Sequence, residues 1–305
     1  MPRRARIALI GATAAVAMLA VTWWVSRHVA PFRAADGSML SGFEALQRPG
    51  VNGLTNFIAA LCDPQQYVFL AMVPVLMALL RRRAWLAVVV LLVIFAANET
   101  TQLLKPLLAA PRVPVPGGPS TDASWPSGHA TAAMSLALCC VIAAPPRWRS
   151  WVAAVMAAFT VAVCWSFLEL GWHYPSDVFG GFLVATAWAL VAVAVVWTAQ
   201  ERATRRAGEG AGAGSRPDRC DDPSALRRRD PSGALRADLS VAQAVTPSLA
   251  LTAAALAFAM LVLALRPDLV IGYALDHETF VAGAAAIGTL ALTIATGLSL
   301  ILQRT

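Results

Sequence analysis

Long apolar stretches alternate with short polar ones along the chain, and this pattern predicts membrane-spanning helices. Eight of the stretches contain about 20 residues each, enough for a helix to cross the hydrocarbon of a bilayer. They are residues 7–25, 57–80, 84–104, 126–144, 151–170, 178–197, 245–265 and 280–302. Residues 30–56 are polar and contain proline and glycine, which is typical of a connection. The sequence therefore predicts an all-α, polytopic membrane helical bundle.

The amino-acid composition supports this fold class. Of the 305 residues, 58% are hydrophobic and 13% are charged, and the mean hydropathy is +0.63. A soluble domain is about half apolar and about a quarter charged. The formal net charge of +7 comes from arginines between the apolar stretches, where they set the orientation of a membrane protein. We therefore expect an integral protein of the plasma (inner) membrane, surrounded by lipids and without a nucleic-acid partner.

The first apolar stretch follows three arginines, Arg3, Arg4 and Arg6. A basic start before an apolar run is also typical of a signal peptide, but this run is long for the hydrophobic region of one. We therefore expect an uncleaved transmembrane helix. The number of copies in the assembled protein is left open by the sequence.

The arginine clusters predict how the helices are oriented. They lie before the first helix, at residues 81–83, at Arg147 and Arg149, and within residues 199–244. With a cytoplasmic N-terminus, every cluster lies on the cytoplasmic side, as the positive-inside rule requires. Both termini are then cytoplasmic.

Residues 199–244 differ in composition from the rest of the chain. Nine arginines lie between Ala199 and Ser240, together with glycine, proline and acidic residues. Such a segment has too few apolar residues to form a packed core, so we expect a flexible cytoplasmic loop. It would separate residues 1–198 from residues 245–305, which contain two additional transmembrane helices.

Three polar segments interrupt the apolar pattern on the predicted extracytoplasmic side. They are residues 105–112, residues 125–129 and residues 171–177, which read KPLLAAPR, WPSGH and GWHYPSD. Charged side chains beside hydrocarbon are costly and usually serve a function. Because three such segments lie on one side, we expect them to form one site.

The second segment is suited to bind an anion. Ser127 is a favourable N-cap for the helix that follows, and a helix N-terminus carries free N–H groups and a partial positive charge. His129 lies in the first turn, within reach of such an anion. Taken alone, the segment could equally be an ordinary cap followed by an interfacial histidine.

The other two segments add a nucleophile and two cations. Asp177 follows His173 by four residues, so its carboxylate can orient the imidazole and leave the second ring nitrogen free. Lys105 and Arg112 could hold phosphate oxygens. These groups together indicate phosphoryl transfer. Two histidines and one aspartate without close pairing are a poor metal site, so no metal is expected.

The three motifs together resemble the type 2 phosphatidic acid phosphatase (PAP2) superfamily. They are Lys-x6-Arg, then Pro-Ser-Gly-His, then Ser-x6-His-x3-Asp, and the likeness covers residues 57–197. The resemblance implies a six-helix core within residues 1–198. It also implies a phosphatase without metal or cofactor, whose substrate is a lipid phosphate or a polyprenyl (di)phosphate.

The resemblance also assigns roles to the residues of the motifs. His173 would attack phosphorus to form a phosphohistidine, Asp177 would orient it, and His129 would protonate the leaving oxygen. The phosphate-binding residues would be Lys105, Arg112, Ser127 and Gly128.

Two positions depart from the family pattern. Val113 follows Arg112 where the first motif usually has a proline, and the second departure lies in the third motif. Phe167 stands where the third motif usually has a phosphate-binding arginine, and Glu169 lies two residues later. The loss of one preorganised donor typically costs roughly 10²–10³ in rate. An alternative reading is therefore a catalytically impaired relative that binds a lipid phosphate or scaffolds envelope enzymes. A third is a transporter that uses Glu99 and Glu169 as proton or substrate sites.

Overall fold

The computed structural model describes residues 1–108, 124–212 and 231–303, and within them the chain folds into α-helices and one short 3₁₀ helix. The helices are α1 (Arg3–His28), α2 (Ala30–Glu44), α3 (Asn52–Ala60), α4 (Pro64–Leu80), α5 (Ala84–Leu107), α6 (Gly128–Ala143), α7 (Arg149–Glu169), α8 (Pro175–Gly212), α9 (Pro231–Leu265), α10 (Pro267–Asp276) and α11 (Glu278–Gln303). The prediction of an all-α membrane bundle is confirmed.

All eight predicted apolar stretches are largely helical, and one of them, 57–80, is divided between α3 and α4. Among the described residues, six helices are long and apolar enough to cross a membrane: α1, α5, α7 with its preceding 3₁₀ turn, α8, α9 and α11. A seventh span results if α3 and α4, which meet at a bend of 60°, are counted together. The helix in the other predicted stretch, α6, has 16 residues and is apolar but shorter.

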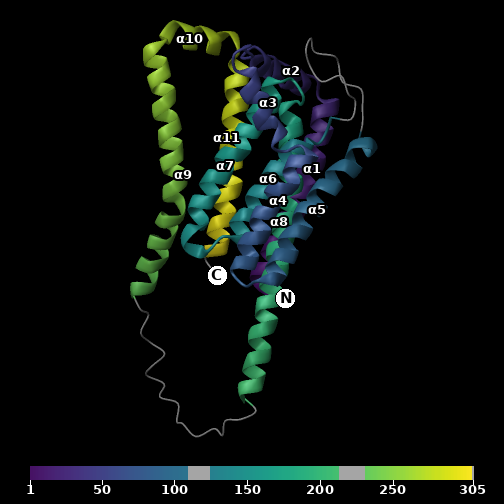
Figure 1. Cartoon of the computed structure of the whole chain (residues 1–305), viewed down its shortest axis with the longest axis vertical. Helices are drawn as coiled ribbons and strands as arrows, with labels where there is room; N and C mark the ends of the chain where they lie inside the picture. The colour runs from purple at the N-terminus through teal and green to yellow at the C-terminus, as the bar shows by residue number, and fades with distance from the viewer. Residues whose placement is uncertain (109–123, 213–230, 304–305) are drawn as a thin grey trace.

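The segment 30–56 is more ordered than its polar composition suggests, and our prediction of a plain connection is wrong. It contains α2 and the start of α3. In α2, Leu40 and Phe43 are three residues apart, so both lie on one face of the helix, where both are buried. The ring of Phe43 packs edge-on against Phe280 of α11, at a centroid distance of 4.8 Å. In Figure 1, α2 lies at the end of the bundle opposite both termini.

Helix α6 forms the centre of the bundle. Every residue from Ala130 to Ala143 is buried, between α4, α5, α7, α8 and α11. Most of these residues are small, which lets neighbouring helix backbones approach closely. One such close approach is at Gly181 of α8, where an added Cβ would lie 2.8 Å from the backbone oxygen of Ser127. Only glycine fits there, so the N-terminal ends of α6 and α8 lie against each other.

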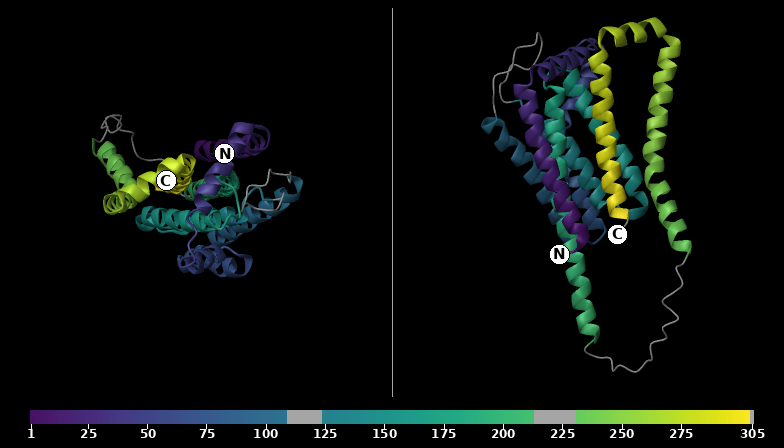
Figure 2. Two further views of the ribbon diagram at one scale, coloured as in Figure 1. Left: turned by 90° about the horizontal axis from the view of Figure 1, so that it is seen from above. Right: turned by 180° about the vertical axis from the view of Figure 1, so that it is seen from behind.

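The helices after α8 are arranged more openly. Helix α11 packs against α7 and α2, whereas α9 lies at the periphery, contacts α7 and α11 over part of its length, and is joined to α11 by α10 (Figures 1 and 2). Helix α8 continues past Trp197 to Gly212 and α9 begins at Pro231, so both extend into the segment expected to be a flexible loop. Residues 213–230 of that segment lie outside the described residues.

Candidate active site

The second and third polar segments meet at the paired N-terminal ends of α6 and α8. Ser127 caps α6 as predicted: its hydroxyl accepts a hydrogen bond from the Ala130 backbone N–H at 3.3 Å. The Ser127 backbone N–H donates to the main-chain oxygen of Asp177 at 3.0 Å. This bond joins two segments that are 50 residues apart in sequence, and it fixes the helix end expected to bind an anion beside His173.

The first turn of α8 holds His173 and Asp177 together. Pro175 starts the helix, as the sequence indicates. Asp177 is fully buried, and its Oδ2 lies 3.4 Å from Nδ1 of His173. That oxygen also accepts a hydrogen bond from the Tyr174 backbone N–H at 3.0 Å. Because Nδ1 faces the carboxylate, the opposite ring nitrogen of His173 is left for a substrate.

The two histidines face a common space. Their ring centroids are 6.3 Å apart, so nitrogen atoms of both rings could approach the same phosphoryl group. Lys105, in the last turn of α5, brings its ammonium group to the same place: an added Cβ on Gly128 would lie 3.5 Å from Lys105 Nζ. Arg112 lies outside the described residues. The other six predicted site residues therefore come together at one end of the bundle.

Asp63 is a site residue that the sequence analysis missed. It is the N-cap residue of α4, and its Oδ1 lies 2.9 Å from Nε2 of His129, within hydrogen-bond distance. Each histidine of the site therefore has its own aspartate. In the sequence, Asp63-Pro64 looks only like the start of a helix, and nothing in the spacing connects it with a histidine 66 residues away.

Asp36 is a second aspartate that the sequence analysis missed, and it stabilises the first turn of α8. Asp36 of α2 is buried, and its carboxylate accepts hydrogen bonds from the backbone N–H of Ser176 at 2.9 Å and from the Ser176 hydroxyl at 2.6 Å. A carboxylate at a helix N-terminus also interacts favourably with the helix dipole. Asp36 thereby holds the helix end that carries His173 and Asp177.

Phe167 forms an apolar wall of the site. Its side chain is fully buried, and its ring centroid lies 5.8 Å from that of His129 and 5.4 Å from that of His173. The position expected to hold a phosphate-binding arginine therefore contacts both histidines. On the opposite edge, the ring of Trp172 lies 5.6 Å from that of His129.

The two glutamates left open by the sequence do not lie together. Glu169 is buried, and its Oε2 accepts a 3.5 Å hydrogen bond from the Thr55 hydroxyl, while its main-chain oxygen accepts one from the Gln47 side chain. In the part of the chain that the structure describes, no ion pair with Lys105 is formed. Glu99 is exposed on α5. Glu99 and Glu169 therefore do not line a common polar path through the described helices, which a transporter would require.

The grouping of these side chains suits attack on a phosphoryl group. It combines a nucleophilic imidazole oriented by a carboxylate, a second imidazole that can give and take a proton, a cation and a helix N-terminus. Among the described residues, no group of three His, Cys, Asp or Glu side chains is placed to hold a metal ion.

Comparison with known proteins leads to the family that the motifs resemble. Residues 84–201 match the model of the PAP2 superfamily, which confirms the predicted resemblance for this part of the chain. Phosphatidylglycerophosphatase B of Escherichia coli (strain K12) and of Shigella flexneri are each 41% identical to the chain over 80 residues. That match covers 26% of this chain and 30% of the relative, so the chain spans less than a third of these curated relatives.

A solved structure has the same fold. It is the crystal structure of the first transmembrane PAP2 type phosphatidylglycerolphosphate phosphatase from Bacillus subtilis, with a TM-score of 0.52 and 20% identity. The likeness covers 62% of this chain and 96% of that chain. Lys105, His129, His173 and Asp177 lie inside the family match at 84–201, whereas Asp63 and helices α9 to α11 lie outside it.

Proposed function

Because residues 84–201 match the model of the PAP2 superfamily, we propose that this integral membrane protein is a lipid phosphatase. It hydrolyses the phosphoric monoester or diphosphate of a membrane lipid, such as a phosphatidate-like lipid or a polyprenyl (di)phosphate. The reaction proceeds through a phosphohistidine and uses neither a metal ion nor another cofactor. The relatives named phosphatidylglycerophosphatase B support a lipid phosphate as the substrate class.

In the first step, the ring nitrogen of His173 that faces away from Asp177 attacks phosphorus. The bond between phosphorus and the lipid oxygen breaks, and protonated His129 gives its proton to that oxygen. In the second step, His129 takes a proton from a water molecule, whose oxygen attacks the phosphohistidine. Inorganic phosphate leaves and His173 is restored.

The remaining site residues hold the phosphate during both steps. Lys105, Arg112, the Ser127 hydroxyl and the Gly128 backbone N–H would neutralise and orient the phosphoryl oxygens. Asp177 keeps the imidazole of His173 in the reactive tautomer. The observation that carries the proposal is the 6.3 Å separation of the two histidine rings, because one nucleophile and one acid must flank a single phosphorus atom.

The site would face the extracytoplasmic side of the plasma (inner) membrane. The arginine clusters favour a cytoplasmic N-terminus, and the site segments follow or precede helix ends on the opposite side. A reporter fused after Thr305 should then be active as a cytoplasmic protein. A reporter that is active only on the outer side would reverse the orientation.

The direct test is phosphate release by the purified protein from a panel of lipid mono- and diphosphates in the presence of EDTA. We expect EDTA-resistant release that falls by at least about 10³-fold in His173→Ala, because the nucleophile is lost. A His277→Ala variant is the matched control, because His277 lies between α10 and α11 and is no part of the site. Release that EDTA abolishes, or that survives in His173→Ala, would contradict the proposed mechanism.

One observation favours a second candidate function. The fully buried Phe167 contacts both histidines where a phosphate-binding arginine is expected. A site with one donor fewer could bind a lipid phosphate without turning it over, and the chain would then act as a binding protein or as a scaffold for envelope enzymes. Binding of a lipid phosphate to the wild type without phosphate release would support this candidate.

A further inference from the structure

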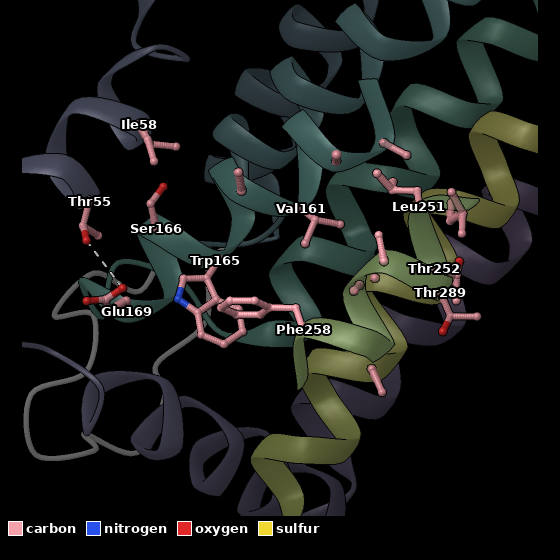
Figure 3. Close-up of a pocket in the computed structure, with 18 of the residues that line it drawn as sticks. Thr55, Ile58, Val161, Trp165, Ser166, Glu169, Leu251, Thr252, Phe258 and Thr289 are labelled. Carbon is pink, nitrogen blue, oxygen red and sulfur yellow. Dashed lines mark hydrogen bonds between the residues drawn. The ribbon is translucent and has the colours of Figure 1, made fainter. Parts of the chain in front are cut away.

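A large apolar cavity lies on the other side of α7 from the two histidines. It has a volume of about 840 Å³, lies between α3, α7, α9 and α11, and is partly open to the outside of the bundle. Figure 3 shows Val161 and Trp165 of α7 and Leu251 and Phe258 of α9 among the side chains that line it. Three of its four walls, α3, α9 and α11, lie outside the PAP2 match.

The surroundings of the cavity indicate what fills it. Helix α9 has only 6% of its most apolar window buried within the protein, so it faces lipid on its outer side. Water has few partners among the lining side chains, and an apolar space of this size does not stay empty between packed helices. A further helix, roughly 10 Å across, would need more volume to run along even three turns. A flexible hydrocarbon chain fits these limits.

Polar groups lie at the ends of the cavity rather than along it. Thr55 and Glu169 are at one end, where the Thr55 hydroxyl donates to Oε2 of Glu169 at 3.5 Å. Thr252 and Thr289 are at the other end (Figure 3). An anionic phosphate would be repelled by a Glu169 carboxylate, whereas a neutral hydroxyl or ester group could bond to Thr55. The cavity therefore suits the uncharged part of a lipid and disfavours its phosphate.

The last turn of α7 connects the cavity with the site. Ser166 and Glu169 line the cavity, while Phe167, between them, contacts His129 and His173. The two spaces are thus separated by about one helix diameter, roughly 10 Å. A lipid whose phosphate lies between the histidines could pass over the end of α7 and place its chain in the cavity.

We infer that the cavity between α3, α7, α9 and α11 binds the hydrocarbon chain of the lipid phosphate substrate. This inference rests on the proposed function. It gives the additional C-terminal helices a role: α9 and α11 select the substrate by its chain, while α5, α6 and α8 hold its phosphate.

The test fills the cavity with one side chain. Gly288 of α11 lines the cavity, and an added Cβ there meets nothing within 4 Å, so Gly288→Phe should fold normally. The matched control is Gly297→Phe on the same helix, since Gly297 also has open space but lines a separate groove against α6 and α8. The KM of each variant is measured for one headgroup with a long chain and with a four-carbon chain.

We expect Gly288→Phe to raise KM for the long-chain substrate by roughly fivefold, the scale of packing interactions between apolar groups in lipid. The four-carbon substrate should be unaffected, as should the control variant with both substrates. Equal KM values for wild type and Gly288→Phe with the long-chain substrate would overturn the inference. Equal losses with both substrates would also overturn it, because they would mean a general disturbance.

A binding experiment separates this inference from the proposed function. A long-chain lipid phosphate with a diazirine at the end of its chain is photo-crosslinked to the protein in vesicles, and the labelled peptides are identified by mass spectrometry. Labelling on α7 and α9 that Gly288→Phe reduces would support the chain site, even for a protein that releases no phosphate. Labelling elsewhere would overturn it. So would labelling of the cavity that excess unlabelled lipid without phosphate removes equally well, which would indicate an ordinary bilayer lipid.

Discussion

Helices α6 and α9 are both apolar, yet they occupy opposite kinds of environment. In α6, every residue from Ala130 to Ala143 is buried. In α9, large side chains such as Leu256, Phe258 and Met260 are exposed. Side-chain size does not explain the difference, because small residues are frequent in both helices. The difference lies in their neighbours: α6 is surrounded by α4, α5, α7, α8 and α11, whereas α9 packs mainly against α7, α10 and α11 among the described helices. Hydropathy therefore does not distinguish a central helix from a peripheral one.

The site belongs to the tightly packed region. Its residues lie at the ends of α5, α6 and α8, where a close backbone approach at Gly181 and the buried carboxylates of Asp36 and Asp177 limit movement. The cavity belongs to the open region, where α9 leaves space. Fixed geometry suits the reacting phosphate, and open space suits chains of variable shape. The following predictions test this contrast, beginning with the largest effect.

The same substitution in the two regions should change stability very differently. Phe182 of α8 is 0% exposed and Phe258 of α9 is 69% exposed. Phe182→Ala should lower the free energy of unfolding by about 3–5 kcal/mol because it leaves a cavity in the core. Phe258→Ala should change it by no more than about 0.5 kcal/mol. Unfolding of both variants in one detergent measures the difference, and similar losses would show that α9 is as tightly packed as α8.

Within the tight region, Phe167→Arg should increase phosphate release. An arginine beside His129 and His173 would restore a donor to the developing charge, worth about 10²–10³ in rate. The control is Phe167→Leu, which changes the wall without adding a donor. Initial rates of phosphate release from the best lipid substrate measure this gain. A folded Phe167→Arg variant with no gain over Phe167→Leu would mean that the packed wall leaves no room for a phosphate-binding side chain.

Asp63→Asn, at the edge of the tightly packed region, should have a smaller effect on the rate. The change keeps a hydrogen-bond acceptor 2.9 Å from His129 but removes the negative charge, which favours the protonated ring that acts as acid. The rate should fall by about tenfold above neutral pH, and the alkaline limb of the pH–rate profile should move to lower pH. Asp63→Glu keeps the negative charge, so the alkaline limb of its pH–rate profile should lie closer to that of the wild type. An unchanged profile in Asp63→Asn would leave Asp63 with a structural role alone.

The parts of the site that depend on short-range sequence relations could be predicted. Ser127 as a cap, Pro175 as a helix start and the four-residue spacing of His173 and Asp177 are local features of helices. Asp63 and Asp36 could not be found in this way, because each reaches the site through the packing of a distant helix. For the same reason the sequence predicts a connection where α2 lies. Its polar residues are visible in the sequence, but the helices against which Leu40 and Phe43 pack are known only from the structure.

Two contacts of Asp177 join the nucleophile to the helix end proposed to bind phosphate, so both can be lost together. Its main-chain oxygen accepts from Ser127 N–H, and its carboxylate faces His173. Fraying of that single turn would disorient the nucleophile and release the phosphate cradle in the same event. Loss of turnover would then follow local opening of α8. The N–H groups of Ser127 and Tyr174 both bond to Asp177. Their amide hydrogen exchange should therefore accelerate together with inactivation, while the rest of the bundle stays folded.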